Sequence, residues 1–289
     1  MRAEPGSFVT PARESGDGVV EAKMDRVCDR TQAVGTLGPR GTRNRASGST
    51  HEPSSPPRFH SGPPLRGSLL QPPNVRYGGG VGDRVIEVFA DIVCPFTHVG
   101  LRRLVERRTA TGRTSPVLHV RAWPLELVNG EPLAGDFVGE EVVALREHVT
   151  PDLFGGFDAT RFPSTSLPAL TLTAAAYRVD AQLGEQVSLA LRDALFEEGA
   201  DIGAFDVLAE IAAAHGLDVP EGVDRDAITA DLDEGRRRGV QGSPHFFLGS
   251  EGFFCPSLEI TRVGGHLQVA FDPKRFEQFA RQALDGPMP

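Results

Sequence analysis

Two apolar runs separated by a helical period open the regularly patterned part of the chain. Residues 85–92 are apolar at most positions, which is typical of a strand buried on both faces of a sheet. From Pro95 the period becomes helical, with Leu101 and Leu104 on the apolar face, and a second apolar run follows at 117–123. This β-α-β order predicts two parallel strands joined by a right-handed crossover.

The middle of the chain, residues 129–238, has a helical hydrophobic period. Helices are expected at 138–148, 168–181, 184–198, 203–215 and 224–238. Residues that favour N-caps lie at Ser166, Asp201 and Asp224. Glycines that favour a helix C-terminus lie at Gly184, Gly199, Gly216 and Gly239.

Strands return after the helical segment. The runs 244–248 and 252–255 predict a hairpin, and a further short strand can form at 266–270. Asp272 and Pro273 then start an amphipathic helix that ends at Leu284. Its predicted inner face holds Phe276, Phe279, Ala280 and Leu284.

The order of these elements is that of a thioredoxin fold with an inserted all-helical domain. A β-α-β opening and a β-β-α closing flank the helices, which makes the chain an α/β protein. We expect a discontinuous thioredoxin-like domain at 83–128 and 237–287, and a helical insertion domain at 129–236.

The first part of the chain has a different composition. Residues 1–80 contain 10 prolines and 12 glycines without a sustained apolar period, so we expect residues 1–82 to form a disordered tail and linker. The net charge of residues 1–80 is +4 and that of the whole chain is −9, so residues 81–289 carry a net charge of −13. An acidic folded part argues against a nucleic-acid partner.

The hydropathy pattern also limits the location. No apolar run reaches the length of about 18 residues that a membrane span needs, and the N-terminal sequence lacks the apolar region of a secretory signal. We therefore expect a cytoplasmic protein without a membrane partner.

The chain has three cysteines, Cys28, Cys94 and Cys255, which are too few and too widely spaced for a disulfide framework. Cys94 lies between the first predicted strand and its helix. The N–H groups and dipole of a helix N-terminus favour a thiolate, so we expect a pKa below the ordinary value of about 8.5. The alternative is that Cys94 is a small buried hydrophobic residue.

Two motifs resemble the active-site segments of the thioredoxin superfamily. Cys94-Pro95-Phe96-Thr97 is similar to its catalytic motif, and the segment 239–247, G-V-Q-G-S-P-H-F-F, is similar to its cis-proline loop. Over 84–286 the chain resembles the DsbA-like family, particularly its cytoplasmic FrnE-like branch. This resemblance implies thiol–disulfide oxidoreductase activity, with Pro95, Phe96, Ser243 and Pro244 as substrate-binding residues. A cis bond before Pro244 would let the Ser243 backbone pair with an extended substrate segment.

Thr97 departs from the family pattern, in which a second cysteine occupies this position. That second thiolate normally resolves the mixed disulfide, so Cys94 needs another resolving thiol. The Thr97 hydroxyl can donate to the Cys94 thiolate, or Thr97 is only a tolerated replacement.

Cys255 is the candidate for a resolving thiol within the chain. A hairpin folded about Ser250–Glu251 would place Cys255 opposite Phe246, near the motif; ordinary core packing is the alternative.

Two histidines and one aspartate lie near these motifs. His98 and His245 could join the two cysteines as a Cys₂His₂ metal set, but the spacing is not that of a structural zinc site, so no metal is expected. Otherwise His98 is expected to stabilise the thiolate or to lie at the helix surface. Asp91 is expected to form a turn at the strand end, with proton relay as the alternative.

The predicted function is therefore that of an enzyme of thiol–disulfide exchange. Cys94 is the predicted nucleophile, Thr97 and Cys255 assist, and the substrate is a protein or small-molecule thiol or disulfide. No covalently bound cofactor is expected, but a low-molecular-weight thiol can take part. One alternative is a thiol-cofactor-dependent isomerase or transferase, resembling 2-hydroxychromene-2-carboxylate isomerases and kappa-class glutathione transferases, which use serine at the position of Cys94 with bound glutathione. Another is a non-catalytic binding module.

Overall fold

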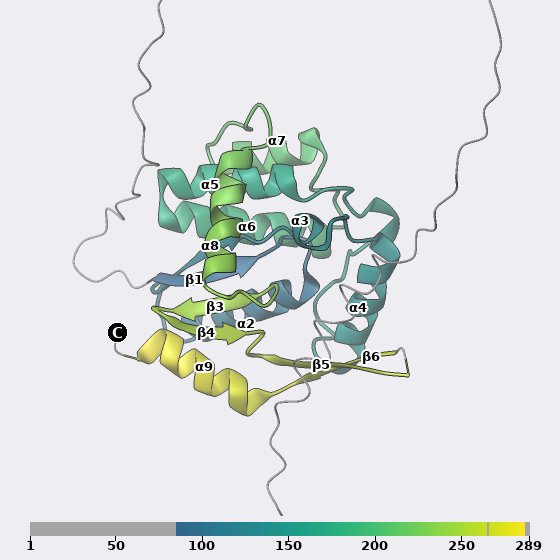
Figure 1. The fold of residues 1–289 in the computed structure, drawn as a ribbon, viewed down its shortest axis with the longest axis vertical. Coiled ribbons are helices and arrows are strands. Elements are labelled where there is room, and N and C mark those ends of the chain that lie inside the picture. Colours follow the sequence, from purple (N-terminus) through teal and green to yellow (C-terminus); the bar gives the residue numbers. More distant parts are fainter. Residues whose placement is uncertain (1–84, 265, 287–289) are drawn as a thin grey trace, which may run out of the picture. The chain divides into compact units, whose positions relative to one another are not determined.

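A four-stranded mixed sheet forms the centre of the fold (Figure 1). The computed structural model describes residues 85–264 and 266–286, so the predicted tail at 1–82 and Cys28 lie outside the described residues. The strands are β1 (Val85–Ala90), β2 (Val117–Ala122), β3 (His245–Leu248) and β4 (Glu251–Phe254), in the order β2-β1-β3-β4. β1 is parallel to β2, as predicted, and antiparallel to β3.

Helices cover both faces of β1, as its nearly uniform hydrophobicity requires. Ile86 and Val88 belong to a hydrophobic cluster with residues of α2 (Pro95–Thr109) and α9 (Pro273–Asp285). Phe89 points to the other face and contributes to a cluster with Leu232 of α8 (Arg225–Arg237). The crossover helix and the C-terminal helix are therefore confirmed.

The helical segment contains the five predicted helices and two short elements that were not predicted. The predicted helices are α4 (Gly135–His148), α5 (Leu167–Val179), α6 (Ala181–Phe196), α7 (Phe205–Ala214) and α8. The short elements are α3 (Leu125–Asn129) and the 3₁₀ turn η2 (Ala159–Arg161). Over the described ranges, no helix is both long and apolar enough to cross a membrane.

Cap assignments were only partly correct. Asp224 caps α8 by accepting a hydrogen bond from the Ala227 N–H, as predicted. Ser166 precedes α5 but forms no side-chain cap bond, and the N-cap residue of α7 is Ala204 instead of Asp201.

Gly184 lies inside α6, so the prediction that it ends a helix is wrong. Asp180 separates α5 from α6 and caps α6 by accepting the N–H groups of Gln182 and Leu183. Gly184 is needed for close helix packing instead, because an added Cβ would lie 2.1 Å from Tyr177 Cδ1.

Gly184→Ala should destabilise the fold by roughly 1–3 kcal/mol, because the buried Tyr177 ring cannot shift without disturbing its neighbours. Urea unfolding of the purified protein measures this loss. Gly222→Ala is the matched control, since nothing lies within 4 Å of the added Cβ. Equal stabilities of the two variants would contradict the close approach of α5 and α6.

β2 is an edge strand whose outward backbone groups are paired by helix side chains. Glu185 accepts the Leu118 N–H at 2.6 Å, and Asp231 accepts the Ala122 N–H at 2.9 Å. The Tyr177 hydroxyl accepts the Val120 N–H at 2.9 Å and donates to the Leu118 carbonyl at 2.7 Å. Side chains of α5, α6 and α8 therefore take the place of a fifth strand. In Figure 1 these three helices lie together on the side of the sheet where β1 is labelled.

The β3–β4 hairpin differs from the prediction by two residues in register. Leu248 pairs with Glu251, so the turn is at Gly249 and Ser250. Cys255 consequently lies opposite Pro244 and not Phe246, and its N–H donates to the Pro244 carbonyl at 3.0 Å. The turn is centred on Gly249 and Ser250, one residue earlier than the predicted centre at Ser250–Glu251. A shift of the centre by one residue changes the pairing register by two residues.

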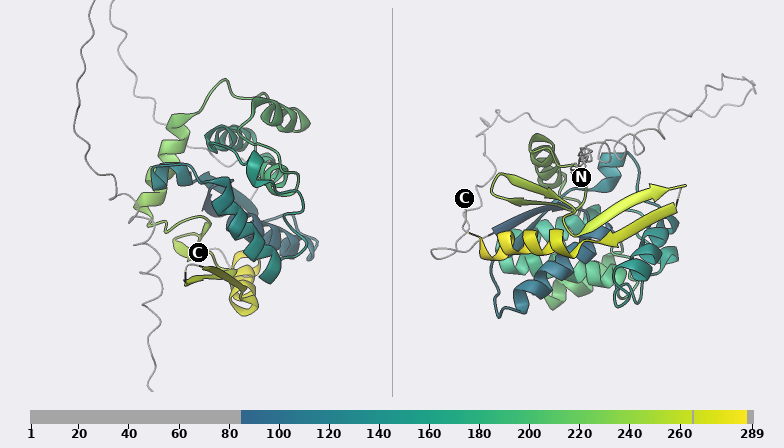
Figure 2. Two further views of the ribbon diagram at one scale, coloured as in Figure 1. Left: turned by 90° about the vertical axis from the view of Figure 1, so that its right-hand side faces the viewer. Right: turned by 90° about the horizontal axis from the view of Figure 1, so that it is seen from below.

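A second, two-stranded sheet precedes the last helix. It consists of β5 (Leu258–Val263) and β6 (His266–Phe271), of which only β6 was predicted. Figure 2 shows this hairpin leading into α9 along one side of the fold.

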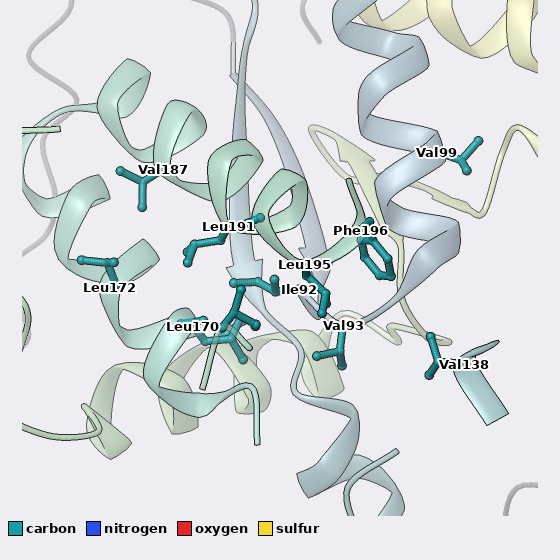
Figure 3. Close-up of a cluster of buried hydrophobic side chains, with 14 of the residues drawn as sticks. Ile92, Val93, Val99, Val138, Leu170, Leu172, Val187, Leu191, Leu195 and Phe196 are labelled. Carbon is teal, nitrogen blue, oxygen red and sulfur yellow. The ribbon is translucent and has the colours of Figure 1, made fainter. Parts of the chain in front are cut away.

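The largest hydrophobic cluster reaches from the helical segment to the end of β1. Ile92 and Val93, which precede Cys94, belong to the same cluster as Leu170, Leu191 and Leu195 (Figure 3). This packing holds the connection between β1 and α2 in place. The domain boundaries near 128 and 237 stay a prediction, because the cluster includes residues from both sides of them.

Candidate active site

Cys94 is the N-cap residue of α2. Its extended backbone, with φ −86° and ψ 113°, ends the β1–α2 connection, and Pro95 occupies the first helical turn. The Cys94 carbonyl accepts the N–H groups of Thr97 at 3.1 Å and His98 at 3.3 Å. Only 3% of the Cys94 surface is exposed.

The loop before β3 brings Ser243 and Pro244 to Cys94. The Ser243–Pro244 peptide bond is cis, and the Cys94 Sγ lies 3.1 Å from the Ser243 carbonyl oxygen. Antiparallel pairing of β3 with β1 sets this approach, since His245 lies opposite Phe89. The two motifs that are distant in sequence therefore meet.

The Ser243 hydroxyl connects the strand end to the helix start. It accepts the Asp91 N–H at 2.9 Å, and its oxygen lies 2.8 Å from the Thr97 Oγ1. Thr97 is fully buried, so its hydroxyl has no competing water. The residue in place of the second cysteine is thus part of a hydrogen-bonded group around Cys94.

The expected lowering of the Cys94 pKa is wrong for this conformation. Burial raises the pKa of the thiol above its ordinary value, and the charge of Glu141 raises it further. Hydrogen bonds with Thr97 and Ser243 lower the pKa but do not offset burial. The helix N-terminus is present as predicted, but loss of hydration has the larger effect.

Asp91 forms the predicted turn and also ties two loops together. Its carboxylate accepts the Val93 N–H at 3.3 Å and the Leu125 N–H at 2.6 Å, while burial raises the pKa of this carboxyl. Its backbone carbonyl accepts a hydrogen bond from the Arg192 guanidinium at 3.2 Å. These contacts give Asp91 a positioning role beneath Cys94.

Arg192 was missed from the sequence. The side chain is fully buried, and it donates to the Ser188 carbonyl at 2.8 Å and hydroxyl at 2.6 Å. Burial lowers the pKa of Arg192 to about 10, so it stays charged at neutral pH. Its position four residues after Ser188, among the apolar positions of α6, was the available signal.

His98 lies inside the fold and not at the helix surface, so that alternative is wrong. Its Nε2 lies 2.7 Å from Glu197 Oε1, and its ring contacts Phe154 and Phe196. Burial lowers the pKa of His98. Burial alone would raise the pKa of Glu197, but hydrogen bonds from His98 and two backbone N–H groups lower it to about 2.

His245 and Cys255 form hydrogen bonds with the loop that contains Ser243 and Pro244. The Nδ1 of His245 accepts the Gln241 N–H at 3.1 Å, and its ring stacks on Phe247 at a centroid distance of 4.7 Å. Burial lowers the pKa of His245 to about 4. Cys255 is buried, with a positive φ of 42°.

The four residues considered for a metal do not come together as a ligand set. Within the part of the chain that the structure describes, no group of three or more His, Cys, Asp or Glu side chains could hold a metal ion.

Of the predicted substrate-binding residues in the motif, Pro95 is buried and Phe96 is half-buried against the large cluster.

Comparison with known proteins identifies the family of the chain. A model of the DSBA-like thioredoxin domain matches residues 85–281. A probable DsbA oxidoreductase from Streptomyces coelicolor is 19% identical, with 71% of this chain and 92% of that chain covered and a TM-score of 0.48. A 2-hydroxychromene-2-carboxylate isomerase is 14% identical, with 59% of this chain and 88% of that chain covered and a TM-score of 0.44. The cytosolic disulfide reductase DsbM from Pseudomonas aeruginosa is 18% identical, with 70% of this chain and 93% of that chain covered and a TM-score of 0.39. A search of curated proteins found no match.

Proposed function

Because the chain belongs to the family of DSBA-like thioredoxin domains, we propose that it is an enzyme of thiol–disulfide exchange with Cys94 as its nucleophile. The observation that carries this proposal is the 3.1 Å contact between Cys94 Sγ and the Ser243 carbonyl at the cis-proline loop. A backbone that lies beside the sulfur can align an extended substrate with it.

The exchange takes place in two balanced steps. The Cys94 thiolate attacks one sulfur of a substrate disulfide, a new S–S bond forms, and the other substrate sulfur leaves with the electron pair and takes up a proton. A second thiolate then attacks the mixed disulfide and releases Cys94. If the second thiolate is external, one disulfide and one thiol are exchanged for another disulfide and thiol, and the protein itself is neither oxidised nor reduced. If the second thiolate is that of Cys255, a Cys94–Cys255 disulfide forms, the substrate leaves as a thiol, and an external thiol must then reduce the protein.

The second thiolate comes from outside the motif, because Thr97 has no sulfur. An external low-molecular-weight thiol is the simpler source, and the predicted cytoplasmic location would supply it in excess. Cys255 is the internal alternative, since its N–H contacts the carbonyl of Pro244, next to the residue that Cys94 contacts.

Burial of Cys94 sets a condition on the first step. A thiol that is 3% exposed and has a raised pKa reacts only after the sulfur becomes accessible and loses its proton. We infer that substrate entry displaces the contact with Ser243. The same burial favours the second candidate, an isomerase or transferase that binds a small thiol, because a closed site suits a small substrate better than a protein.

A peptide carrying a fluorescent group and a mixed disulfide with glutathione tests the proposal. We expect intact-mass analysis to find a glutathione adduct on Cys94, formed as reduced peptide is released. Added glutathione should then remove this adduct as glutathione disulfide. Cys255→Ser should turn over at the same rate if resolution is external, and should accumulate the adduct if it is internal. Failure of Cys94 to form any adduct at saturating disulfide would contradict thiol–disulfide exchange.

A further inference from the structure

Arg192 of α6 is a buried positive charge without a carboxylate partner. None of its surface is exposed, and no Asp or Glu among the described residues forms an ion pair with it. Its Nε has no hydrogen-bond partner within the same part of the chain. Arg108 shows the contrast, because it is also buried but is paired with Glu185. Since an unpaired buried charge is costly, the place of Arg192 calls for an explanation in the function of its surroundings.

The Arg192 guanidinium lies close to the connection that ends at Cys94. Its Nη2 donates to the Asp91 carbonyl at 3.2 Å, and the next residues of the chain form a turn that leads to Cys94. Leu191, which precedes Arg192 in α6, packs in one cluster with Ile92 of this turn (Figure 3). Because the Cα atoms at the two ends of such a turn lie within about 7 Å, the charge is roughly 10 Å from the sulfur.

Ser243 connects Asp91 and Cys94 by a second path. Its hydroxyl accepts the Asp91 N–H at 2.9 Å, and its carbonyl oxygen lies 3.1 Å from Cys94 Sγ. The residue that Arg192 binds is therefore separated from the thiol by only one residue through space.

The Asp91 carboxyl is the first alternative as the counter-charge of Arg192. Its two oxygens accept the N–H groups of Val93 and Leu125, whereas Arg192 binds the backbone carbonyl of Asp91. Burial raises the pKa of this carboxyl and so opposes its ionisation, although its hydrogen bonds and the charge of Arg192 act in the other direction. The thiolate of Cys94 is the other anion that can form next to this connection.

The remaining titratable groups around the connection do not supply a second free cation. They are Glu126 of α3, Glu141 of α4, Tyr177 of α5, His98 and Arg102 of α2, Asp193 and Glu197 of α6, and His245 of β3. His98 is paired with Glu197, and Arg102 is paired with Asp193. The charge of Glu141 opposes the thiolate. Among these groups, Arg192 is therefore the unpaired cation that can favour it.

We propose that the buried charge of Arg192 is the counter-charge of the Cys94 thiolate and acts on the sulfur through space, without touching it. The inference rests on the proposed role of Cys94 as nucleophile. Two unit charges about 10 Å apart move an ionisation midpoint by roughly one pH unit at an effective dielectric constant of about 20. Burial still raises the pKa of Cys94 above its ordinary value, so Arg192 limits this rise and does not reverse it.

The rate of alkylation of Cys94 by iodoacetamide, measured against pH in a Cys28→Ser/Cys255→Ser background, tests this role. The reagent is uncharged, so its approach does not depend on the charge of Arg192. Arg192→Met should raise the midpoint by about one pH unit and lower the rate about tenfold well below the midpoint, with the high-pH plateau unchanged. Arg192→Lys keeps the charge and should keep the original midpoint.

Two further variants separate the charge from the packing. Arg192→Gln is neutral but keeps an N–H donor, so it should shift the midpoint as Arg192→Met does. It also takes the place of the methionine variant should that one fail to fold, which circular dichroism reports. Arg107→Met removes a cation of α2 whose side chain is 30% exposed, and it should leave the midpoint unchanged because water and salt screen that charge.

Two results would overturn the proposal. An unchanged midpoint in the neutral variants means that Arg192 only holds the connection at Asp91. Equal shifts in Arg192→Lys and Arg192→Met mean that the shape of the side chain matters and its charge does not. Alkylation needs no disulfide substrate, so Arg192 can have this role even if the protein fails to catalyse exchange.

Discussion

Cys94→Ser should leave no measurable turnover of the peptide–glutathione disulfide above the rate in buffer. A serine oxygen cannot form a disulfide, so the mixed-disulfide step is lost and not merely slowed. Release of reduced fluorescent peptide in the presence of glutathione measures the effect. The thermal unfolding midpoint should change little, because serine is close to cysteine in size.

The same variant separates the two candidate functions. An isomerase or transferase that binds a small thiol can use serine at this position, so it would keep activity toward its own substrate after Cys94→Ser. Cys94→Ala removes the hydroxyl as well and is the matched comparison. Exchange that persists in both variants would rule out Cys94 as the nucleophile.

Glu185→Ala should destabilise the protein by about 3–5 kcal/mol, the typical cost of leaving a buried charge without its partner. Arg108 and Glu185 form a buried ion pair with side-chain exposures of 8% and 11%. Glu185 also accepts the Leu118 N–H of the edge strand β2, so the variant additionally leaves this buried N–H without its acceptor. Equilibrium unfolding in urea measures the loss.

Two comparisons give this prediction its controls. The double variant Arg108→Met/Glu185→Leu should be more stable than Glu185→Leu alone, because no unpaired charge stays buried. Asp285→Ala removes an exposed ion pair with Arg113, whose side-chain exposures are 49% and 42%, and should change stability little. Similar losses for Glu185→Ala and Asp285→Ala would contradict the importance of the buried pair.

Local features of the site could be predicted from the sequence because they depend on neighbouring residues. The apolar run before Cys94, the proline after it and the helical period that follows determine β1, the cap position and α2 without reference to the rest of the chain. The similarity of 239–247 to a cis-proline loop then indicated which distant segment would meet Cys94.

Features that depend on burial and on long-range contacts could not be predicted in the same way. The pKa of Cys94 follows from how completely the surrounding helices remove water from its sulfur, and no sequence pattern reports that. The sequence positions of Tyr177, Glu185 and Asp231 are typical of amphipathic helices. Their hydrogen bonds with the backbone of β2 depend on how the helices pack against that edge, which no local pattern indicates. The hairpin register depended on the position of the turn, which lies one residue earlier than predicted.

Threonine at position 97 has a consequence for how the state of the protein would depend on its surroundings. In a protein with two motif cysteines, the ratio of disulfide to dithiol follows the reduction potential of that internal couple. Cys94 can only share a disulfide with another molecule or with a cysteine outside the motif. If external thiols resolve it, the fraction of protein held as the mixed disulfide will follow the concentrations of the thiols and disulfides around it by mass action. Such a protein would respond to the composition of the thiol pool rather than to a potential of its own.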